Sequence, residues 1–409
     1  MPITENLIRA LPKTDLHVHL DGSLRLSSLI EMAEQRGVSL PSNTPEGMTE
    51  LVFKERYDSL ADYLKGFFYT GAVLRDSEAL ERAAYELMMD NIEEGVRYVE
   101  VRFAPQLHIG DSLDMLDVCL AVNRGLKRAT DEVNRSDPVR SDGEPPFTYG
   151  MILCAMRMFT EEFSPYFSRM IQVHSESPPK QIFGLASLEL VRAAVRIRDE
   201  YGLPIVGFDL AGQENGYPAI DHVEAYRYAH EHFLKKTVHA GEAYGPESIF
   251  QAITALHADR IGHGYHLFSP WLIENRAVSD RGTYVRELSE YIADRRITIE
   301  VCITSNLQTN PNIRVAGNHA MQEMLNRRLS VTLCTDNRLV SNTTVTREIM
   351  LAADTFGLDP ELLKNIIIYG FKRSFYPGTY MEKRNYVRKI IDYYEQIEAE
   401  HLGEERAEA

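Results

Sequence analysis

Short runs of β-branched and aromatic residues recur along this chain, and longer amphipathic stretches separate them. Apolar runs of this kind, bounded by turn residues, are typical of buried strands. They predict strands at residues 13–19, 96–103, 147–155, 203–209, 236–240, 259–263, 297–304 and 329–335. Between the strands, apolar residues recur at helical spacing, most clearly at 76–95, 113–135, 187–202, 219–236 and 319–329.

The alternation of strands and helices predicts an α/β fold with a parallel sheet. Eight such units are the number in a TIM (β/α)8 barrel, and a doubly wound open sheet is the alternative. No linker rich in Pro, Gly or Ser divides the chain, and no internal repeat is visible, so we expect a single domain over residues 1–409. We interpret residues 136–146, 175–180 and 271–284 as insertions, whose roles the sequence does not indicate.

Composition and charge narrow the range of partners. Hydrophobic residues make up 44% of the chain and charged residues 25%, which is typical of a globular protein and excludes a disordered or fibrous chain. The net charge of −16 repels phosphate backbones and anionic membranes. No stretch reaches the roughly 20 apolar residues of a membrane span. We therefore expect a small-molecule substrate, with neither nucleic acid nor a membrane as partner.

The spacing of the cysteines indicates the redox state of the compartment in which the protein folds. They are far apart and include no CxxC pair, so they indicate neither a disulfide framework nor a cysteine zinc cluster. They are typical of core thiols in a reducing compartment. Because the N-terminal residues also contain no apolar run of signal-peptide length, we expect a cytoplasmic protein.

The first predicted strand ends in two histidines separated by one residue, His17 and His19. Strand side chains alternate with a period of two, so both imidazoles point to the same face. A single histidine near a strand end is about as often a hydrogen-bonded structural residue as a ligand. Two at this spacing, beside a carboxylate at Asp21, favour a metal site.

Further ligand and acid–base side chains follow the later strands. His239 ends the fifth predicted strand with Glu242 three residues on, His263 ends the sixth, and Asp336 follows the eighth. In a barrel these positions meet at the carboxyl ends of the strands, where barrel enzymes build their active sites. Three imidazoles and one carboxylate are a suitable set for a catalytic Zn²⁺, with a position left for water, and Glu242 and His263 then remain for proton transfer.

Other motifs are absent. The chain contains no GxxxxGK[ST], no GxGxxG after a strand, no GxSxG and no HExxH, which argues against a P-loop, a Rossmann cofactor site, a serine-hydrolase elbow and a zincin. The HxE and PCxxC pattern of the zinc nucleobase deaminases is also absent. His230 and His232 lie in a predicted amphipathic helix, where we expect structural roles.

Six segments, HVHLDGSLR, DLAGQE, HAGE, RIGHG, TSNLQTN and TDN, occur in this order between about residues 13 and 338. Together they resemble the adenosine deaminase family of zinc-dependent barrel hydrolases. The resemblance implies a barrel with additional helices capping its carboxyl-terminal face, one Zn²⁺ per chain, and hydrolytic removal of the 6-amino group of a purine nucleoside. Residues 51–71 resemble the family's helical cap, although a helix face packed on the barrel explains their apolar residues about equally well.

The resemblance also implies a role for each matching residue. The metal ligands would be His17, His19, His239 and Asp336. Glu242 would protonate the purine N1, and His263 would orient or deprotonate the attacking water; Asp336 joins these two as a catalytic residue. Asp21 would contact a ribose hydroxyl and the Gly212 backbone N–H the purine N3, with His19 and Asn337 also at the substrate. Because a glutamate must be protonated to act as this acid, we predict a raised pKa for Glu242.

The chain departs from the family pattern at two positions. Asn337 stands where many members have a second Asp, which contacts the purine N7. N7 is an acceptor, so that Asp must be protonated to donate, whereas an Asn amide donates without titrating. Ile303 replaces a common proline, which we expect to alter backbone stiffness rather than chemistry.

The leading functional hypothesis is deamination of adenosine and 2′-deoxyadenosine to inosine and 2′-deoxyinosine. The enzymatic alternative is deamination of another 6-aminopurine, such as adenine or a 5′-modified adenosine. A catalytically silent nucleoside-binding barrel is a further alternative, disfavoured because Glu242, His263 and all four ligand positions are intact. The sequence leaves open the metal used in the cell, since Fe²⁺, Co²⁺ or Mn²⁺ accept similar ligands, and also the oligomeric state.

Overall fold

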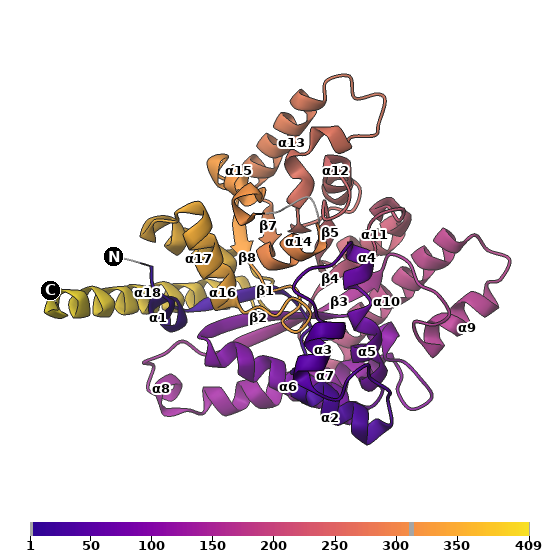
Figure 1. The fold of residues 1–409 in the computed structure, drawn as a ribbon, viewed down its shortest axis with the longest axis horizontal. Helices are drawn as coiled ribbons and strands as arrows, with labels where there is room; N and C mark the ends of the chain where they lie inside the picture. The colour runs from indigo at the N-terminus through magenta and orange to yellow at the C-terminus, as the bar shows by residue number, and fades with distance from the viewer. Residues whose placement is uncertain (1–2, 311–314, 409) are drawn as a thin grey trace.

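The computed structural model describes residues 3–310 and 315–408 and contains an eight-stranded parallel barrel (Figure 1). Its strands are β1 Lys13–His19, β2 Val96–Phe103, β3 Thr148–Met156, β4 Ile205–Ala211, β5 Lys235–Ala240, β6 Arg260–His263, β7 Thr298–Val301 and β8 Val331–Leu333. Each strand pairs with the next one in sequence. A bridge between Val18 and Asp336 joins the first strand to the segment after the last. The predicted TIM barrel is therefore confirmed, and the open sheet is excluded.

Helices surround the strands and fill the connections between them (Figure 1). They are α1 Glu5–Ala10, α2 Leu26–Arg36, α3 Pro45–Leu51, α4 Leu60–Tyr63, α5 Gly66–Val73, α6 Ser77–Glu93, α7 Met115–Asn134, α8 Asp137–Arg140, α9 Pro165–Val173, α10 Pro179–Tyr201, α11 Val223–Glu231, α12 Pro246–Thr254, α13 Arg281–Arg295, α14 Ile303–Thr309, α15 Met321–Asn326, α16 Val345–Phe356, α17 Pro360–Arg373 and α18 Tyr380–Glu408. Short 3-10 turns complete the set: η1 Pro105–Leu107, η2 Ala219–His222, η3 Tyr265–Phe268, η4 Pro270–Leu272 and η5 Ala316–Asn318.

Local sequence explains why these elements form. Strands β1 and β2 are buried at every position, as expected when a parallel sheet is covered on one face by helices and filled on the other by its own side chains. Helix starts carry capping side chains: Asp76 caps α6, and Asp114 and Asp117 form a capping box at the start of α7. Packing of the amphipathic faces of these helices on the barrel provides most of the core.

The first connection, between β1 and β2, carries more helices than the single one of a simple barrel unit. It contains α2, α3, α4 and α5 before the barrel helix α6. Helix α4 packs against α14, which directly follows the carboxyl end of β7. The extra helices therefore cover the carboxyl-terminal face, as predicted.

Two predicted elements need correction. The strand predicted at 297–304 ends at Val301, and α14 begins at Ile303, because the polar Thr304, Ser305 and Asn306 form a first helical turn instead of continuing the sheet. The helix predicted at 219–236 ends at Glu231, and its last two residues begin β5. The other predicted strands agree with the structure within two residues at nearly every end.

The three predicted insertions lie at different places on the barrel. Residues 136–146 contain α8 and precede β3, and Lys389 Nζ of α18 contacts Asp142 Oδ1 there at 2.6 Å. Residues 175–180 join α9 to α10, and 271–284 run from η4 into α13. None of these residues lines the cavity described below. Among the described residues, no helix is both long and apolar enough to cross a membrane.

Candidate active site and metal centre

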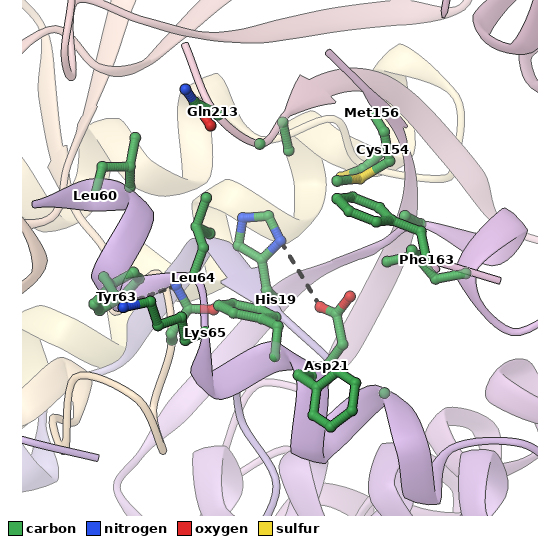
Figure 2. Close-up of a pocket in the computed structure, with 18 of the residues that line it drawn as sticks. His19, Asp21, Leu60, Tyr63, Leu64, Lys65, Cys154, Met156, Phe163 and Gln213 are labelled. Carbon is green, nitrogen blue, oxygen red and sulfur yellow. Dashed lines mark hydrogen bonds and ion pairs between the residues drawn. The ribbon is translucent and has the colours of Figure 1, made fainter. Parts of the chain in front are cut away.

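A cavity of about 440 Å³ lies at the carboxyl ends of the strands, beneath the cap helices. Figure 2 shows His19 and Asp21 from the end of β1 on one side, and Cys154 and Met156 from β3 on another. Leu60, Tyr63 and Leu64 of the cap complete the wall, which is mostly apolar. A mostly apolar cavity with a few converging polar groups is the usual form of a small-molecule site. Residues 51–71 thus supply lining residues, and some of the same side chains also pack against the hydrophobic core.

The four predicted metal ligands converge at the base of this cavity. One possible ligand atom from each of His17, His19, His239 and Asp336 lies within 4.8 Å of the others, and all four residues are buried. His239 Nε2 is 3.0 Å from His17 Nε2 and 3.1 Å from His19 Nε2. Asp336 Oδ1 is 3.4 Å from His17 Nε2 and 3.5 Å from His19 Nε2.

The opposite ring nitrogens show that this cluster suits a cation. His17 Nδ1 donates to Glu300 Oε2 at 2.8 Å, and His239 Nδ1 donates to Asp209 Oδ1 at 3.2 Å. When these two rings are neutral, each carries its proton on Nδ1, and their Nε2 lone pairs point at each other. Facing lone pairs in a buried site repel unless a cation lies between them, and carboxylate-supported imidazoles are the usual ligands of transition metals. The donor set therefore fits a divalent metal ion such as zinc.

A buried network of charges below the ligands keeps these carboxylates ionised. Arg102 contacts both of them, with Nη1 2.8 Å from Asp209 Oδ2 and Nη2 2.9 Å from Glu300 Oε2. Arg260 Nε adds a contact of 2.6 Å to Glu300 Oε1 and also pairs with Glu100. Burial opposes ionisation, but Arg102 and Arg260 hold the pKa of Glu300 well below its usual value. Both carboxylates thus remain acceptors for the imidazole N–H groups.

Glu242 lies in a different environment on the cavity wall. Burial, together with the charges of Asp336 and Glu214, raises the pKa of Glu242 well above its ordinary value of 4.5, as predicted. Its Oε2 is 3.7 Å from His263 Nε2. A protonated carboxyl group facing a substrate cavity can act as a general acid.

The loop that presents Glu242 is held by the carboxylate of Glu214. That carboxylate accepts hydrogen bonds from the backbone N–H groups of Gly241, Glu242, Ala243 and Tyr244 and from the Ser248 hydroxyl. Although Glu214 is buried, the charge of Arg157 and these donors lower its pKa. Glu214 therefore acts as an anionic anchor for the Glu242 loop.

His263 and Asp336 both have left-handed backbone conformations, with φ of 64° and 61°. Non-glycine residues in this region are strained, and such strain is concentrated at functional sites. Hydrogen bonds from neighbouring side chains fix both residues. Ser305 Oγ donates to Asp336 Oδ2 at 2.6 Å, and Asn306 Nδ2 donates to His263 Nδ1 at 3.1 Å. Both neighbours belong to the first turn of α14, directly after the strand predicted at 297–304.

The predicted substrate contacts also line the cavity. Asp21 Oδ1 is buried without a hydrogen-bond partner, as expected for an atom that meets a ligand hydroxyl. Gly212 has a φ of 96°, a conformation that favours glycine. Asn337 Nδ2 donates to the hydroxyl of Tyr63 at 2.8 Å, while a Cβ at Gly22 would lie 1.8 Å from Asn337 Oδ1. The amide nitrogen therefore faces the cap, and the oxygen faces the Gly22 backbone.

Residues outside the cavity match their structural interpretation. His230 stacks on His257, and His232 stacks on Tyr228. Within the described residues, the group at the base of the cavity is the one found with metal-ligand geometry. The four cysteines are buried and unpaired: Cys119, Cys154, Cys302 and Cys334.

Sequence reasoning missed several residues that organise the site. They are charged or polar side chains within apolar segments or within the motifs DLAGQE and TSNLQTN, where no role was predicted for them: Tyr63, Asp209, Glu214, Glu300, Ser305 and Asn306. A carboxylate inside an otherwise apolar strand is a usable signal for Asp209 and Glu300. The pairing of Tyr63 with Asn337 has no local signal.

Comparisons with known proteins agree with this geometry. The family model described as adenosine deaminase matches residues 12–393. The adenosine deaminase of Mycolicibacterium vanbaalenii is 33% identical over 376 residues, covering 91% of this chain and 93% of the relative. That of Mycobacterium tuberculosis strain H37Rv is 33% identical over 376 residues, covering 91% of this chain and 92% of the relative.

Solved structures share the fold. A complex of ADAL with IMP has a TM-score of 0.72 at 24% identity, covering 96% of this chain and 100% of the other. An amidohydrolase from Burkholderia ambifaria with bound zinc has a TM-score of 0.75 at 20% identity, covering 98% of this chain and 96% of the other. The match of the family model over nearly the whole chain, together with relatives at 33% identity, shows that this chain is a hydrolase that belongs to the adenosine deaminase family.

Proposed function

We propose that this protein deaminates adenosine and 2′-deoxyadenosine to inosine and 2′-deoxyinosine, with release of ammonia. The observation that carries the proposal is the convergence of three imidazoles, one carboxylate and Glu242, whose pKa is raised, at the base of one mostly apolar cavity. A purine fits the apolar wall, and the polar groups at the base match the chemistry needed at its C6 and N1.

We assign one Zn²⁺ per chain to His17, His19, His239 and Asp336. The support is the donor set itself, nitrogen and oxygen ligands whose imidazoles are oriented by Glu300 and Asp209. A zinc ion held by these residues would lower the pKa of bound water from about 15.7 to about 7 and would so supply a nucleophile at neutral pH.

Glu242 supplies the proton that makes the purine electrophilic. Addition of the attacking oxygen at C6 places negative charge on N1, and a proton given to N1 by the Glu242 carboxyl group neutralises it. Because the pKa of Glu242 is raised, its carboxyl group holds that proton to higher pH than an ordinary glutamate does. His263, 3.7 Å from Glu242, is suited to orient or deprotonate the attacking water.

The remaining roles concern recognition of the nucleoside. Asp21 accepts a hydrogen bond from a ribose hydroxyl, the Gly212 N–H donates to N3, and the Asn337 amide donates to N7. His19 lies beside the sugar end of this arrangement. These roles are supported by the position of all four residues on the cavity wall.

The test is turnover of adenosine by zinc-loaded protein, followed by ultraviolet absorbance with ammonia measured in the same sample. We expect equal amounts of ammonia and inosine, loss of activity after chelation, and recovery on adding zinc. Adenine and a 5′-phosphorylated adenosine belong in the same panel. A protein that turns over one of these in preference to adenosine carries out the same reaction on another 6-aminopurine, which refutes the substrate assignment. A zinc-loaded protein without activity on the whole panel refutes the deaminase proposal.

Cellular context forms part of the proposal. Four buried, unpaired cysteines suit a reducing compartment, so we place the protein in the cytoplasm. We propose that residues 1–409 form one domain, because α18 packs back on the barrel, where the Tyr386 hydroxyl donates to the Arg97 carbonyl at 2.7 Å. The strong negative charge argues against nucleic acid as a partner.

A further inference from the structure

Three buried polar side chains form a chain of hydrogen bonds that ends at His263. It begins at a backbone amide, because the N–H of Met321 donates to His319 Nδ1 at 3.0 Å. A backbone N–H can only donate, so His319 Nδ1 is an acceptor and carries no proton. The proton of the neutral His319 ring must therefore be on Nε2.

The donor and acceptor in this first hydrogen bond determine the donors and acceptors in the next two. His319 Nε2 lies 3.1 Å from Asn306 Oδ1 and donates to it. With its oxygen used in this way, Asn306 directs Nδ2 toward His263 Nδ1 at 3.1 Å and donates to that nitrogen. His263 Nδ1 is thus an acceptor too, which leaves the ring proton on Nε2.

We infer that His319 and Asn306 are positioning residues that fix the tautomer of His263, so that its Nε2–H points into the active-site cavity as a hydrogen-bond donor. The two residues are 2% and 1% exposed, and Asn306 lies in the helical turn that follows β7. Burial lowers the pKa of His319 to about 3, so its ring is neutral at the pH of any assay.

The tautomer decides between the two roles left open for His263. An Nε2 that already carries a proton donates to the attacking oxygen or to Glu242 and orients it. The same nitrogen is not available to take a proton from water while the hydrogen-bond chain is intact. His263 is therefore an orienting donor in this protein. This role rests on the proposed deaminase function, whereas the tautomer itself does not.

Nitrogen-15 NMR of the histidine-labelled full-length protein reads the tautomer directly. Ring nitrogens with and without a proton have clearly separated chemical shifts, and the signals are assigned by their loss in the His263→Asn and His319→Asn variants. We expect both residues to show a protonated Nε2 and an unprotonated Nδ1 in the zinc-loaded wild type. A protonated Nδ1 on either ring overturns the inference, whether or not the protein deaminates adenosine.

The Asn306→Asp variant tests whether the chain controls His263. A carboxylate still accepts from His319, but its second oxygen can only accept, so it requires a proton on His263 Nδ1. We expect the His263 Nδ1 signal to become that of a protonated nitrogen and kcat/KM for adenosine to fall by roughly 100-fold. If the variant keeps the wild-type tautomer and kcat/KM, the inference is wrong.

The matched control is Asn310→Asp, one turn further along the same segment. Asn310 Nδ2 contacts His266 Nε2 at 3.3 Å, and His266 does not line the cavity. We expect this variant to keep the His263 signals and the activity. If the wild type has no adenosine deaminase activity, the proposed function fails, while the NMR result still decides the tautomer. If Asn306→Asp does not fold, the wild-type spectrum alone decides which ring nitrogens of His263 and His319 carry a proton.

Discussion

Glu242 and Glu214 illustrate how the site sets the state of a side chain at the scale of single residues. Both are buried on the same side of the cavity base, and their carboxyl groups are chemically identical. The charge of Arg157 and the surrounding hydrogen-bond donors lower the pKa of Glu214, whereas burial and the charges of Asp336 and Glu214 raise the pKa of Glu242. One residue is therefore a fixed anion, and the other is an acid that can release a proton.

We expect Glu242→Gln to reduce kcat for adenosine by about 10² to 10⁴, because the amide keeps the shape of the carboxyl group but cannot deliver its proton. Bound zinc, measured by atomic emission, should remain at one ion per chain. Glu224→Gln, on the exposed surface of α11, serves as the control and should keep full activity. Wild-type turnover by the Glu242→Gln variant would remove Glu242 from the mechanism.

We expect Tyr63→Phe to lower kcat/KM for adenosine by about 10-fold. Loss of the hydroxyl frees the Asn337 amide to rotate, and its carbonyl would then repel the purine N7. Tyr57→Phe is a close control, since the Tyr57 ring packs edge-on against Tyr63 at 5.1 Å and its hydroxyl contacts backbone carbonyls instead of Asn337. Steady-state kinetics on both variants separate the two effects: an equal loss in both would point to cap packing alone.

At the scale of elements, the active site depends on where strands give way to helices. Strands β1 and β2 have the predicted bounds. Pro12 and the Asp21-Gly22 pair lie close to the two ends of β1, and Gly95 and Pro105 lie close to those of β2. The end of β7 is different. Residues 297–304 have the pattern of one strand, yet the structure shows that the strand ends at Val301 and that α14 places Ser305 and Asn306 beside Asp336 and His263. A strand assignment would have directed alternate residues away from the site.

The start of α14 is joined to α16 by a buried glutamate. Glu348 Oε2 accepts from the Thr304 N–H at 3.2 Å, and its Oε1 accepts from the Thr343 hydroxyl at 2.8 Å. Burial raises the pKa of Glu348 from 4.5 to about 7. Between these pH values the native state binds more protons than the unfolded state, so the free energy of unfolding falls as the pH rises from about 4.5 to about 7.

We therefore expect Glu348→Gln to raise the free energy of unfolding at pH 8 by about 1 to 3 kcal/mol, and by progressively less as the pH approaches 5. A glutamine keeps both hydrogen bonds, with its carbonyl toward Thr304 and its amide toward Thr343. Urea unfolding at several pH values measures the difference. Asp354→Asn, exposed on the same helix, is the control and should show no such trend. If the two proteins differ in free energy of unfolding by the same amount across this pH range, the raised pKa of Glu348 is contradicted.

At the scale of the whole molecule, the metal site is supported from inside the barrel. The buried charges of Arg102, Asp209, Glu300 and Arg260 come from strands β2, β4, β7 and β6 and meet below the ligands. The sequence displays each of these charges, but which ones pair depends on the register of strands far apart in the chain. The ligand positions were predictable because each follows a strand end; their supporting network was not.

We expect Glu300→Gln to weaken zinc binding by about 10- to 100-fold, because the amide orients the His17 ring less strongly and leaves Arg102 and Arg260 short of one negative charge. Competition with a chromogenic chelator gives the affinity without relying on turnover. Glu323→Gln, partly exposed on α15 and paired with Arg327, should leave the affinity unchanged. Unaltered zinc affinity in the Glu300→Gln variant would show that the network serves folding alone.

The bridge between Val18 and Asp336 has a consequence for the opening of the barrel. Two backbone hydrogen bonds of 2.7 Å, from His19 N to Asp336 O and from Asp336 N to His17 O, close the circle of strands, and all three residues are proposed ligands. Opening this seam separates the ligands, so zinc must stabilise the closed seam by the free energy that it gains on binding. The amide protons of His19 and Asp336 should then exchange with deuterium much faster in metal-free protein than those of β3. The ion would then hold the first strand against the segment after the last one, in addition to activating the attacking water.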